Sequence, residues 1–229
     1  MSTRKIARPR AAPRLPTERP GQAGGTRDAN RTARIRQICT AALPLYLRHG
    51  IGSVTIDQIV DRAAIAKGSF YRYFTDQEQV VATLLAPMAA AMRTGMATAA
   101  TRLAAARDPD LLPAIYLALA TELTDAVTPE PDVLRLYLQE CRSPPMGACR
   151  PVRALADDIA RQAIELSQVA KDFGLLRDTD PRVGALTVIG AVERLAFAVL
   201  AGEDVGGLAA LPHTFISVIL DGVRRPRST

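Results

Sequence analysis

Residues 54–81, VTIDQIVDRAAIAKGSFYRYFTDQEQVV, contain two short helical patterns separated by a tight turn. In the first pattern the apolar residues Ile56, Ile59, Val60 and Ala63 follow the i, i+3, i+4, i+7 spacing. Because a helical turn takes about 3.6 residues, this spacing places their side chains in one stripe. The pattern therefore predicts a short amphipathic helix that packs its apolar stripe against the rest of a small domain.

Two threonines mark where helices begin. Thr55 is followed three residues later by Gln58, the spacing of a capping box, which predicts that the first helix starts at Thr55. Thr75 and Glu78 have the same spacing. We therefore expect a second capping box at Thr75 that opens a further helix.

The segment between these helices, about residues 67–74, has a mixed character. Phe70 and Phe74 lie four residues apart and are suited to burial, while polar and basic residues occupy the other face. Two short helices joined by a tight turn, the second with a polar and basic free face, are typical of a helix-turn-helix whose second helix enters the DNA major groove. An ordinary aromatic core is the alternative reading of this segment alone.

Individual residues of the second helix suit contact with DNA. Gly68 has no side chain, so the helix amino terminus could approach the groove closely. Lys67 and Arg72 are able to reach a guanine edge or a phosphate. Tyr71 and Tyr73 carry a hydroxyl at the tip of a rigid ring, which suits a phosphate oxygen.

The upstream segment supplies a longer helix. Ile35, Ile38, Ala42 and Leu45 share one face, and the pattern stops at His49-Gly50, where glycine can take a left-handed conformation. Pro44 departs from this simple pattern.

The order of these segments is informative. An apolar helix ending in His-Gly, a Thr-capped helix, a turn, KGSFYRYF and a capped helix follow one another along residues 31–85. This order resembles the amino-terminal DNA-binding domain of the TetR (tetracycline repressor) family of bacterial transcriptional regulators.

The resemblance implies roles for particular residues. It places Ile56, Ile59, Phe70 and Phe74 in the small core. The residues that match DNA-contacting positions are Thr55, Lys67, Gly68, Ser69, Tyr71, Arg72 and Tyr73.

The sequence departs from the family pattern at three places. Ala64-Ile65 replaces the usual Gly-Val of the turn, a mild steric change. Ala66 replaces a Ser or Thr, which weakens the cap of the recognition helix, and Gln77 replaces a lysine that often binds a phosphate. We therefore expect one charged DNA contact to be missing.

Basic residues are concentrated at the amino terminus. Residues 1–30 hold seven Lys or Arg and two acidic residues, whereas residues 79–229 hold fifteen basic and seventeen acidic residues. Because residues 1–30 have almost no large apolar side chains, we expect a disordered basic arm. An arm of this kind ahead of a DNA-binding domain can add phosphate or minor-groove contacts, and whether this one does stays open. A plain solubilising tail or a misplaced start codon are the alternatives. No apolar segment follows the basic residues, so a secretory signal is not indicated.

The remaining sequence predicts an all-α chain. Residues 31–78 form a three-helix domain with the helix-turn-helix, and residues 79–229 form a larger helical domain for effector binding and dimerisation. Residues Pro181 to Leu200 are apolar on nearly every face, and Pro212 to Val223 are similar. The resemblance implies that these two helices pair with their copies in a homodimer, although a buried monomer core would fit the periodicity equally. Glu193 and Arg194 argue against a membrane span.

No catalytic set competes with this interpretation. The two histidines, His49 and His213, lack metal-ligand spacing, and there is no phosphate-binding glycine loop or nucleophile elbow. Cys39, Cys141 and Cys149 lack CxxC spacing, which favours a reduced, cytoplasmic interior over a disulfide framework. A redox role for Cys141 and Cys149 stays open. We expect no enzyme activity, cofactor or metal; a helical enzyme or binding protein without DNA activity is the rival hypothesis.

The family resemblance implies a ligand-responsive repressor that binds palindromic operator DNA and is released by a small molecule, with an activator or ligand-independent regulator as alternatives. Bulky, flexible or singly polar residues on apolar helices are candidates for the effector site. They are Met88, Met92, Met96, Tyr116, Leu119, Leu123, Tyr137, Glu140, Cys141, Gln168 and Phe197. With Glu140 the only carboxylate among them, we expect an apolar or cationic effector.

Overall fold

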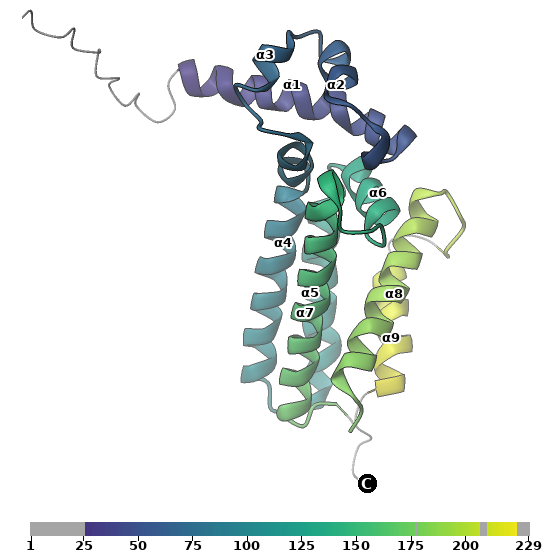
Figure 1. The fold of residues 1–229 in the computed structure, drawn as a ribbon. Coiled ribbons are helices and arrows are strands. Elements are labelled where there is room, and N and C mark those ends of the chain that lie inside the picture. Colours follow the sequence, from purple (N-terminus) through teal and green to yellow (C-terminus); the bar gives the residue numbers. More distant parts are fainter. Residues whose placement is uncertain (1–25, 177, 207–209, 224–229) are drawn as a thin grey trace, which may run out of the picture.

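The computed structural model describes residues 26–176, 178–206 and 210–223, and these residues form helices and connections without a β-strand (Figure 1). The predicted all-α fold is thus confirmed. Residues 1–25 of the predicted arm lie outside the described residues. The first helix begins at Thr26, so residues 26–30, expected to belong to the arm, are helical instead.

The amino-terminal domain has the predicted order of elements. Its helices are α1 (Thr26–His49), α2 (Ile56–Arg62) and α3 (Lys67–Phe70), with a 3-10 turn, η1 (Ile51–Ser53), after α1. Gly50 closes α1 with φ +76° and ψ 149°, a backbone region that is open almost only to glycine. Pro44 lies inside α1 without ending it.

A larger helical body follows. Its elements are α4 (Gln77–Ala105), η2 (Pro109–Leu111), α5 (Leu112–Val127), α6 (Pro131–Glu140), η3 (Gly147–Cys149), α7 (Arg150–Asp172), α8 (Pro181–Leu200) and α9 (Leu211–Val223). Helix α4 packs against α5 and α7, α7 packs against α8, and α5 packs against α9. The short helix α6 lies beneath α1 and also contacts α8 (Figure 1). This position makes α6 the bridge between the two parts of the molecule.

Helix caps agree with the sequence at one site and differ at the other. The capping box of α2 is confirmed, since Thr55 Oγ1 accepts the backbone N–H of Gln58 and Gln58 Oε1 accepts that of Thr55. The predicted cap at Thr75 is wrong by one residue. Asp76 caps α4 by accepting the N–H of Gln79 at 2.9 Å, because a carboxylate is at least as good a cap as a hydroxyl.

Two clusters of buried apolar residues stabilise the fold. The upper core runs from α1–α3 into α4, α6 and α7, and includes Ile38, Tyr46, Ile59, Phe70, Phe74, Val80, Val81, Leu85, Met88, Val133, Leu136 and Val152. The lower core joins α4, α5, α7 and α9, and includes Ala99, Leu103, Leu112, Leu119, Leu166, Ile216 and Leu220. The upper core is therefore continuous across the expected domain boundary at residue 78.

Two helices are long and apolar enough to cross a membrane, judged by length and composition alone. They are α4 and α8, and the bent pair of α5 and α6 would give a third span by the same test. Helix α4 contributes Val80, Leu85 and Leu103 to the two cores. Helix α8, in contrast, leaves much of its apolar surface uncovered within the protomer.

Candidate nucleic-acid interface

The recognition segment is fixed from beneath by aromatic side chains. Phe70 and Phe74 are buried in the upper core with their ring centroids 5.8 Å apart, as predicted. Tyr71 meets the edge of Phe70 at 5.5 Å but keeps about half of its surface exposed. Burial of the two phenylalanines therefore turns the opposite face of α3 outward.

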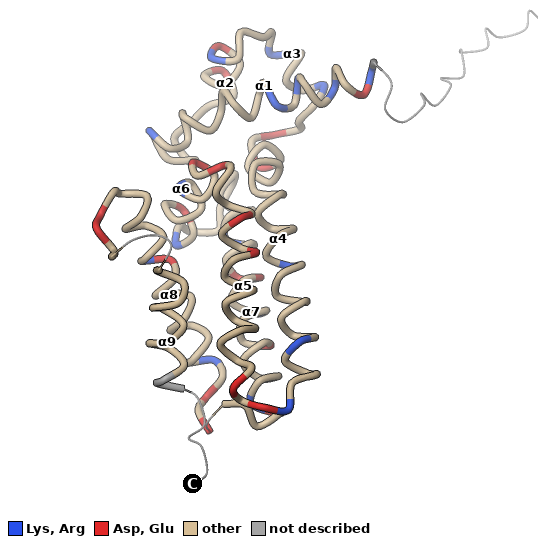
Figure 2. Tube along the Cα trace, turned by 180° about the vertical axis from the view of Figure 1, so that it is seen from behind, with Lys and Arg blue, Asp and Glu red and all other residues tan. Residues whose placement is uncertain are grey.

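This outward face carries the predicted DNA-contacting residues. Lys67, Gly68, Tyr71 and Arg72 are exposed, and Ser69 and Tyr73 are half-buried beside them. Thr55 is also exposed, but its hydroxyl is engaged in the cap of α2. In the tube view, Lys and Arg lie along α1 and around α3 at the end of the molecule away from the carboxyl terminus (Figure 2).

Lys67 has an intramolecular partner in the free protein. Its Nζ lies 2.7 Å from Oδ1 of Asp57 on α2, and both side chains are more than half exposed. The hydrogen bond with Asp57, followed by the coulombic attraction, raises the pKa of Lys67. A phosphate that binds Lys67 must therefore compete with Asp57, and the exposed pair is easily exchanged because water screens it.

Gly68 is not required by the packing of the protein itself. A Cβ built on Gly68 would meet no atom of the chain within 4 Å, and the residue has no positive φ. Glycine at this position therefore leaves open space on the outside of the helix amino terminus.

The turn between α2 and α3 contains a strained residue. Ala64 has φ +51°, the only positive φ among the described non-glycine residues. The turn closes α2 with hydrogen bonds from Ile65 N–H to Val60 O and from Ala64 N–H to Asp61 O. This pairing is the Schellman motif, whose left-handed position normally takes glycine. The change from Gly to Ala is therefore more than the mild steric change expected from the sequence.

Replacing Ala64 with glycine should stabilise the protein. The left-handed conformation costs alanine about 1–2 kcal/mol, and the larger unfolded-state entropy of glycine offsets part of the gain, leaving about 0.5–1 kcal/mol. Urea unfolding followed by circular dichroism measures this difference. Ala63→Gly, at the preceding residue with φ −76°, is the matched control and should destabilise. Equal losses in both variants would show that Ala64 is not strained.

The two other departures from the family pattern also have structural consequences. Ala66 precedes α3 without any side-chain cap, as expected. The side chain of Gln77 turns inward, where its Oε1 accepts the Tyr46 hydroxyl at 3.3 Å and its Nε2 donates to Val54 O at 2.9 Å. Gln77 thus joins α1 to the start of α2 from within and presents no cation at the start of α4.

Glu140 lies between the two parts of the molecule. Its carboxylate is 7% exposed and accepts the N–H of Ile51 at 3.2 Å and the hydroxyl of Ser143 at 2.7 Å. Gln139 Nε2 also donates to it, and Cys149 Sγ lies 4.0 Å away. Since protein donors occupy this carboxylate, it gives no support to the expected cationic effector. Its observed role is to fasten the end of α6 to the η1 turn of the amino-terminal domain.

A second polar cluster fastens α6 to α8. The Tyr137 hydroxyl donates to Glu193 Oε1 at 3.0 Å, and Arg142 Nη2 donates to Glu193 Oε2 at 2.7 Å. Burial, followed by the nearby charge of Glu193, raises the pKa of Tyr137. The sequence showed Glu193 only as an interruption of an apolar helix, and nothing local pointed to Tyr137 or Arg142 as its partners.

The other predicted effector residues lie in the two buried clusters and, for two of them, on the surface. Met88, Met92, Tyr137 and Cys141 belong to or border the upper core. The lower core contains or borders Met96, Tyr116, Leu119 and Leu123. Gln168 is exposed and donates to Asp172, while Phe197 is exposed beneath the Arg194 guanidinium.

The three cysteines of the chain form no disulfide bond. Cys39, Cys141 and Cys149 are free thiols, and all three are buried. Burial raises the pKa of Cys39 to about 11 and is the first cause of the raised pKa values of the other two. Among the described residues, no group of three or more His, Cys, Asp or Glu side chains is placed to hold a metal ion.

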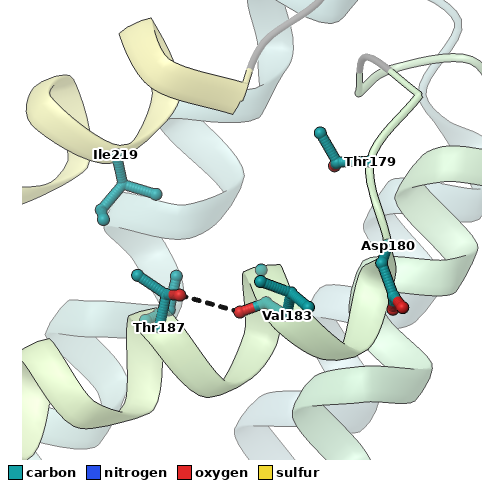
Figure 3. A pocket seen from close by; sticks show the side chains of 7 residues that line it. Thr179, Asp180, Val183, Thr187 and Ile219 are labelled. Atoms are coloured by element: carbon teal, nitrogen blue, oxygen red, sulfur yellow. Dashed lines mark hydrogen bonds between the residues drawn. The ribbon is translucent and has the colours of Figure 1, made fainter.

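Two hollows of about 390 Å³ each open at the surface, and neither is lined by a predicted effector residue. One lies between α8 and α9, where Val183 and Thr187 face Ile219 (Figure 3). The other lies at the far end of the body, against Leu111 and Ile115. The first hollow borders the exposed apolar surface of α8.

Comparison with known proteins agrees with this geometry. Residues 38–84 match the sequence model of the bacterial regulatory proteins of the tetR family. A search of curated proteins found no match.

Solved structures share the fold at low sequence identity. The fatty acid degradation regulator FadR from Bacillus halodurans is 18% identical, with 82% of this chain and 99% of that chain covered and a TM-score of 0.61. A TetR family transcription regulator from Marinobacter aquaeolei VT8 is 16% identical, with coverages of 86% and 99% and a TM-score of 0.61. SmeT, the repressor of the Stenotrophomonas maltophilia multidrug efflux pump SmeDEF, is 18% identical, with coverages of 83% and 90% and a TM-score of 0.55. SmeT is also known as a complex with triclosan, with a TM-score of 0.52.

Proposed function

Because residues 38–84 match the model of the bacterial regulatory proteins of the tetR family, we propose that this protein is a ligand-responsive, sequence-specific repressor of transcription. The observation that carries the proposal is the outward face of α3. There, Lys67, Tyr71 and Arg72 surround a glycine whose open side meets no protein atom. Polar and cationic groups around a close-approach point are what a helix needs to reach base edges in the major groove.

Alanine at Arg72 or at Gly68 should weaken operator binding without unfolding the protein. Loss of a guanidinium that reads a base edge costs about 1–3 kcal/mol and relaxes the preference at that base pair. A methyl group at Gly68 would fill the space needed by the groove while meeting nothing inside the chain. The operator is first selected from random duplexes, and affinities are then measured by fluorescence anisotropy.

The control for this experiment is Arg93→Ala, which removes an exposed cation from α4 on the body. It should keep the affinity and the base preferences of the original protein. Circular dichroism should give a melting temperature for Gly68→Ala that is equal to or slightly above that of the original protein, because alanine favours a helix at a position with negative φ. If Arg72→Ala and Gly68→Ala bind as the Arg93 variant does, α3 is not the recognition helix.

The proposed repressor acts as a homodimer on a near-palindromic operator. Val183, Leu186, Gly190 and Phe197 follow one face of α8, and the three large side chains among them are each at least 45% exposed. Val218 on α9 is 68% exposed and precedes Ile219, which lines the hollow between these helices. A second copy that covers this apolar surface would also place two α3 helices on one DNA face. Because the proposed regulator is cytoplasmic, a partner subunit rather than lipid is the proposed cover of this apolar surface.

The effector of this repressor is proposed to be a small, largely apolar molecule. SmeT, which shares the fold, is known with triclosan bound. In this chain Met92, Met96 and Tyr116 are half-buried where the upper and lower cores meet along α4 and α5. The phenol of Tyr116, whose pKa burial raises to about 12, can donate or accept a hydrogen bond to a ligand.

Helix α6 offers a route from the effector to the DNA. It is fastened to η1 through Glu140 and to α8 through Tyr137, Arg142 and Glu193. A ligand that displaces α6 would therefore move the amino-terminal domain relative to the dimer helices. Because coupling between two sites is reciprocal, such a ligand must bind the free protein more tightly than the operator-bound protein.

A further inference from the structure

The early start of α1 creates a row of arginines that the sequence pattern did not show. Arg27, Arg31 and Arg34 are separated by four and three residues, so they share one face of α1. Ile38 continues this row and is fully buried in the upper core. The row therefore faces the same side of α1 as the helix-turn-helix and extends beyond it toward the amino terminus.

Contacts join the arginine row to the recognition elements. The Arg31 guanidinium lies 6.0 Å from the ring centroid of Tyr73, next to α3, within the range of a cation–π contact. Arg34 donates to Gln37 Oε1 at 2.7 Å, and Gln37 Nε2 donates to Ala63 O at the end of α2, also at 2.7 Å. Arg31 and Arg34 are thus placed beside α3 and α2 by defined contacts, and Arg27 follows one turn further out on the same face.

The charge of the row is available to a ligand. Arg27 and Arg31 are exposed, and neither forms an ion pair with another described residue. Asp28 is the only acid between residues 26 and 36. In the tube view the cationic residues of α1 lie at the end of the molecule that also carries α3 (Figure 2). At the start of α4, by contrast, Gln77 is turned inward and supplies no charge.

We propose that Arg27, Arg31 and Arg34 form a second DNA-contacting surface, which binds backbone phosphates flanking the base pairs read by α3. This inference rests on the proposed function. Guanidinium groups suit phosphate because they offer several donors in a fixed plane. The Arg31–Tyr73 contact joins the arginine row to the proposed recognition helix α3 in one surface. DNA bound at α3 would therefore extend over the row, which favours the DNA backbone over an acidic protein segment as its ligand. The row supplies cationic contacts that the inward Gln77 does not.

Neutralising the row should flatten the salt dependence of operator binding. Each phosphate contact contributes about 0.9 to the steepness of log K against log salt. Arg27→Gln with Arg31→Gln removes two contacts from each protomer of the proposed dimer, so it should lower the steepness by roughly 3.6. The ranking of operator variants should stay the same, because phosphate contacts carry no base information. Phosphate ethylation interference should lose signals outside the base pairs that depend on Arg72.

The matched control removes the same charge from the same helix. Arg36 is nine residues from Arg27 and therefore on the opposite face of α1, and Arg48 lies at the far end of the helix; both are exposed. Arg36→Gln with Arg48→Gln should leave the slope and the ethylation pattern unchanged. All proteins are full-length, so residues 1–25 are present in each.

The outcomes separate this inference from the proposed function. Equal slopes for the two double variants would overturn the arginine row as a contact surface, even when Arg72→Ala weakens binding as expected. If Arg72→Ala also binds normally, the proposed function itself fails. A reordering of operator variants by Arg27→Gln with Arg31→Gln would show that the row reads bases, which contradicts a phosphate contact.

Discussion

Aspartate at both Leu186 and Val218 should convert the proposed dimer into monomers and weaken operator binding by at least about 100-fold. Both side chains are exposed in the protomer, on α8 and α9 respectively, so the substitutions leave its own core intact. In a symmetric interface each aspartate would be buried in an apolar surface and would appear twice, and unpaired buried charges are strongly unfavourable. Sedimentation velocity measures the mass, and fluorescence anisotropy measures the affinity for operator.

The control places the same charges on apolar surface elsewhere. Leu111 and Met146 are exposed, in η2 and just before η3, and Leu111→Asp with Met146→Asp should stay dimeric. Ile189 also lies on α8, but it is unsuitable for this substitution because it packs against the upper core of its own protomer. A dimer that survives Leu186→Asp with Val218→Asp would place the subunit interface elsewhere.

Alanine at Glu140 should lower the free energy of unfolding by about 3 kcal/mol. The substitution leaves the Ile51 N–H without its acceptor in a buried position, and Ser143 loses its partner as well. For a chain of this size the loss corresponds to a fall in melting temperature of roughly 6–12 °C. Differential scanning calorimetry measures both quantities.

Two further variants show whether the hydrogen bonds carry this effect. Glu140→Gln keeps an oxygen that can accept the Ile51 N–H, so it should recover most of the stability. Glu130→Ala removes an exposed carboxylate that makes no cap at the start of the same helix and should change the melting temperature little. A Glu140→Ala protein as stable as the Glu130 variant would contradict the assigned role of Glu140.

The helix-turn-helix could be predicted because its determinants are local. The cap of α2 needs only Thr55 and Gln58, and the burial of Phe70 and Phe74 follows from their spacing on one short helix. The start of α4 was misplaced because Thr75 and Asp76 are adjacent and both are good caps. Neighbouring cap residues cannot be ranked without the geometry of the preceding turn.

The roles of the body residues depend on distant partners. From the sequence alone, Glu140 is a candidate effector contact, because it is a polar residue on a helix with several large apolar side chains. Its actual partner, the Ile51 N–H, lies 89 residues away, so no local pattern links the two residues. Likewise, the pairing of Tyr137 with Glu193 spans 56 residues, and no helical periodicity reports it. Periodicity also could not show which apolar side chains of α8 face outward, since nearly every face of that helix is apolar.

The continuous upper core limits how this protein can be rebuilt. A chimaera joined at residue 78 would separate Phe74 from Val81, Leu85 and Leu136, which belong to the same buried cluster. Transplanting the amino-terminal domain onto a foreign sensor would therefore expose apolar surface on both sides of the joint and favour aggregation. A workable graft must carry the first turns of α4 and the facing side of α6 with it, so the portable unit of this protein is larger than its amino-terminal domain.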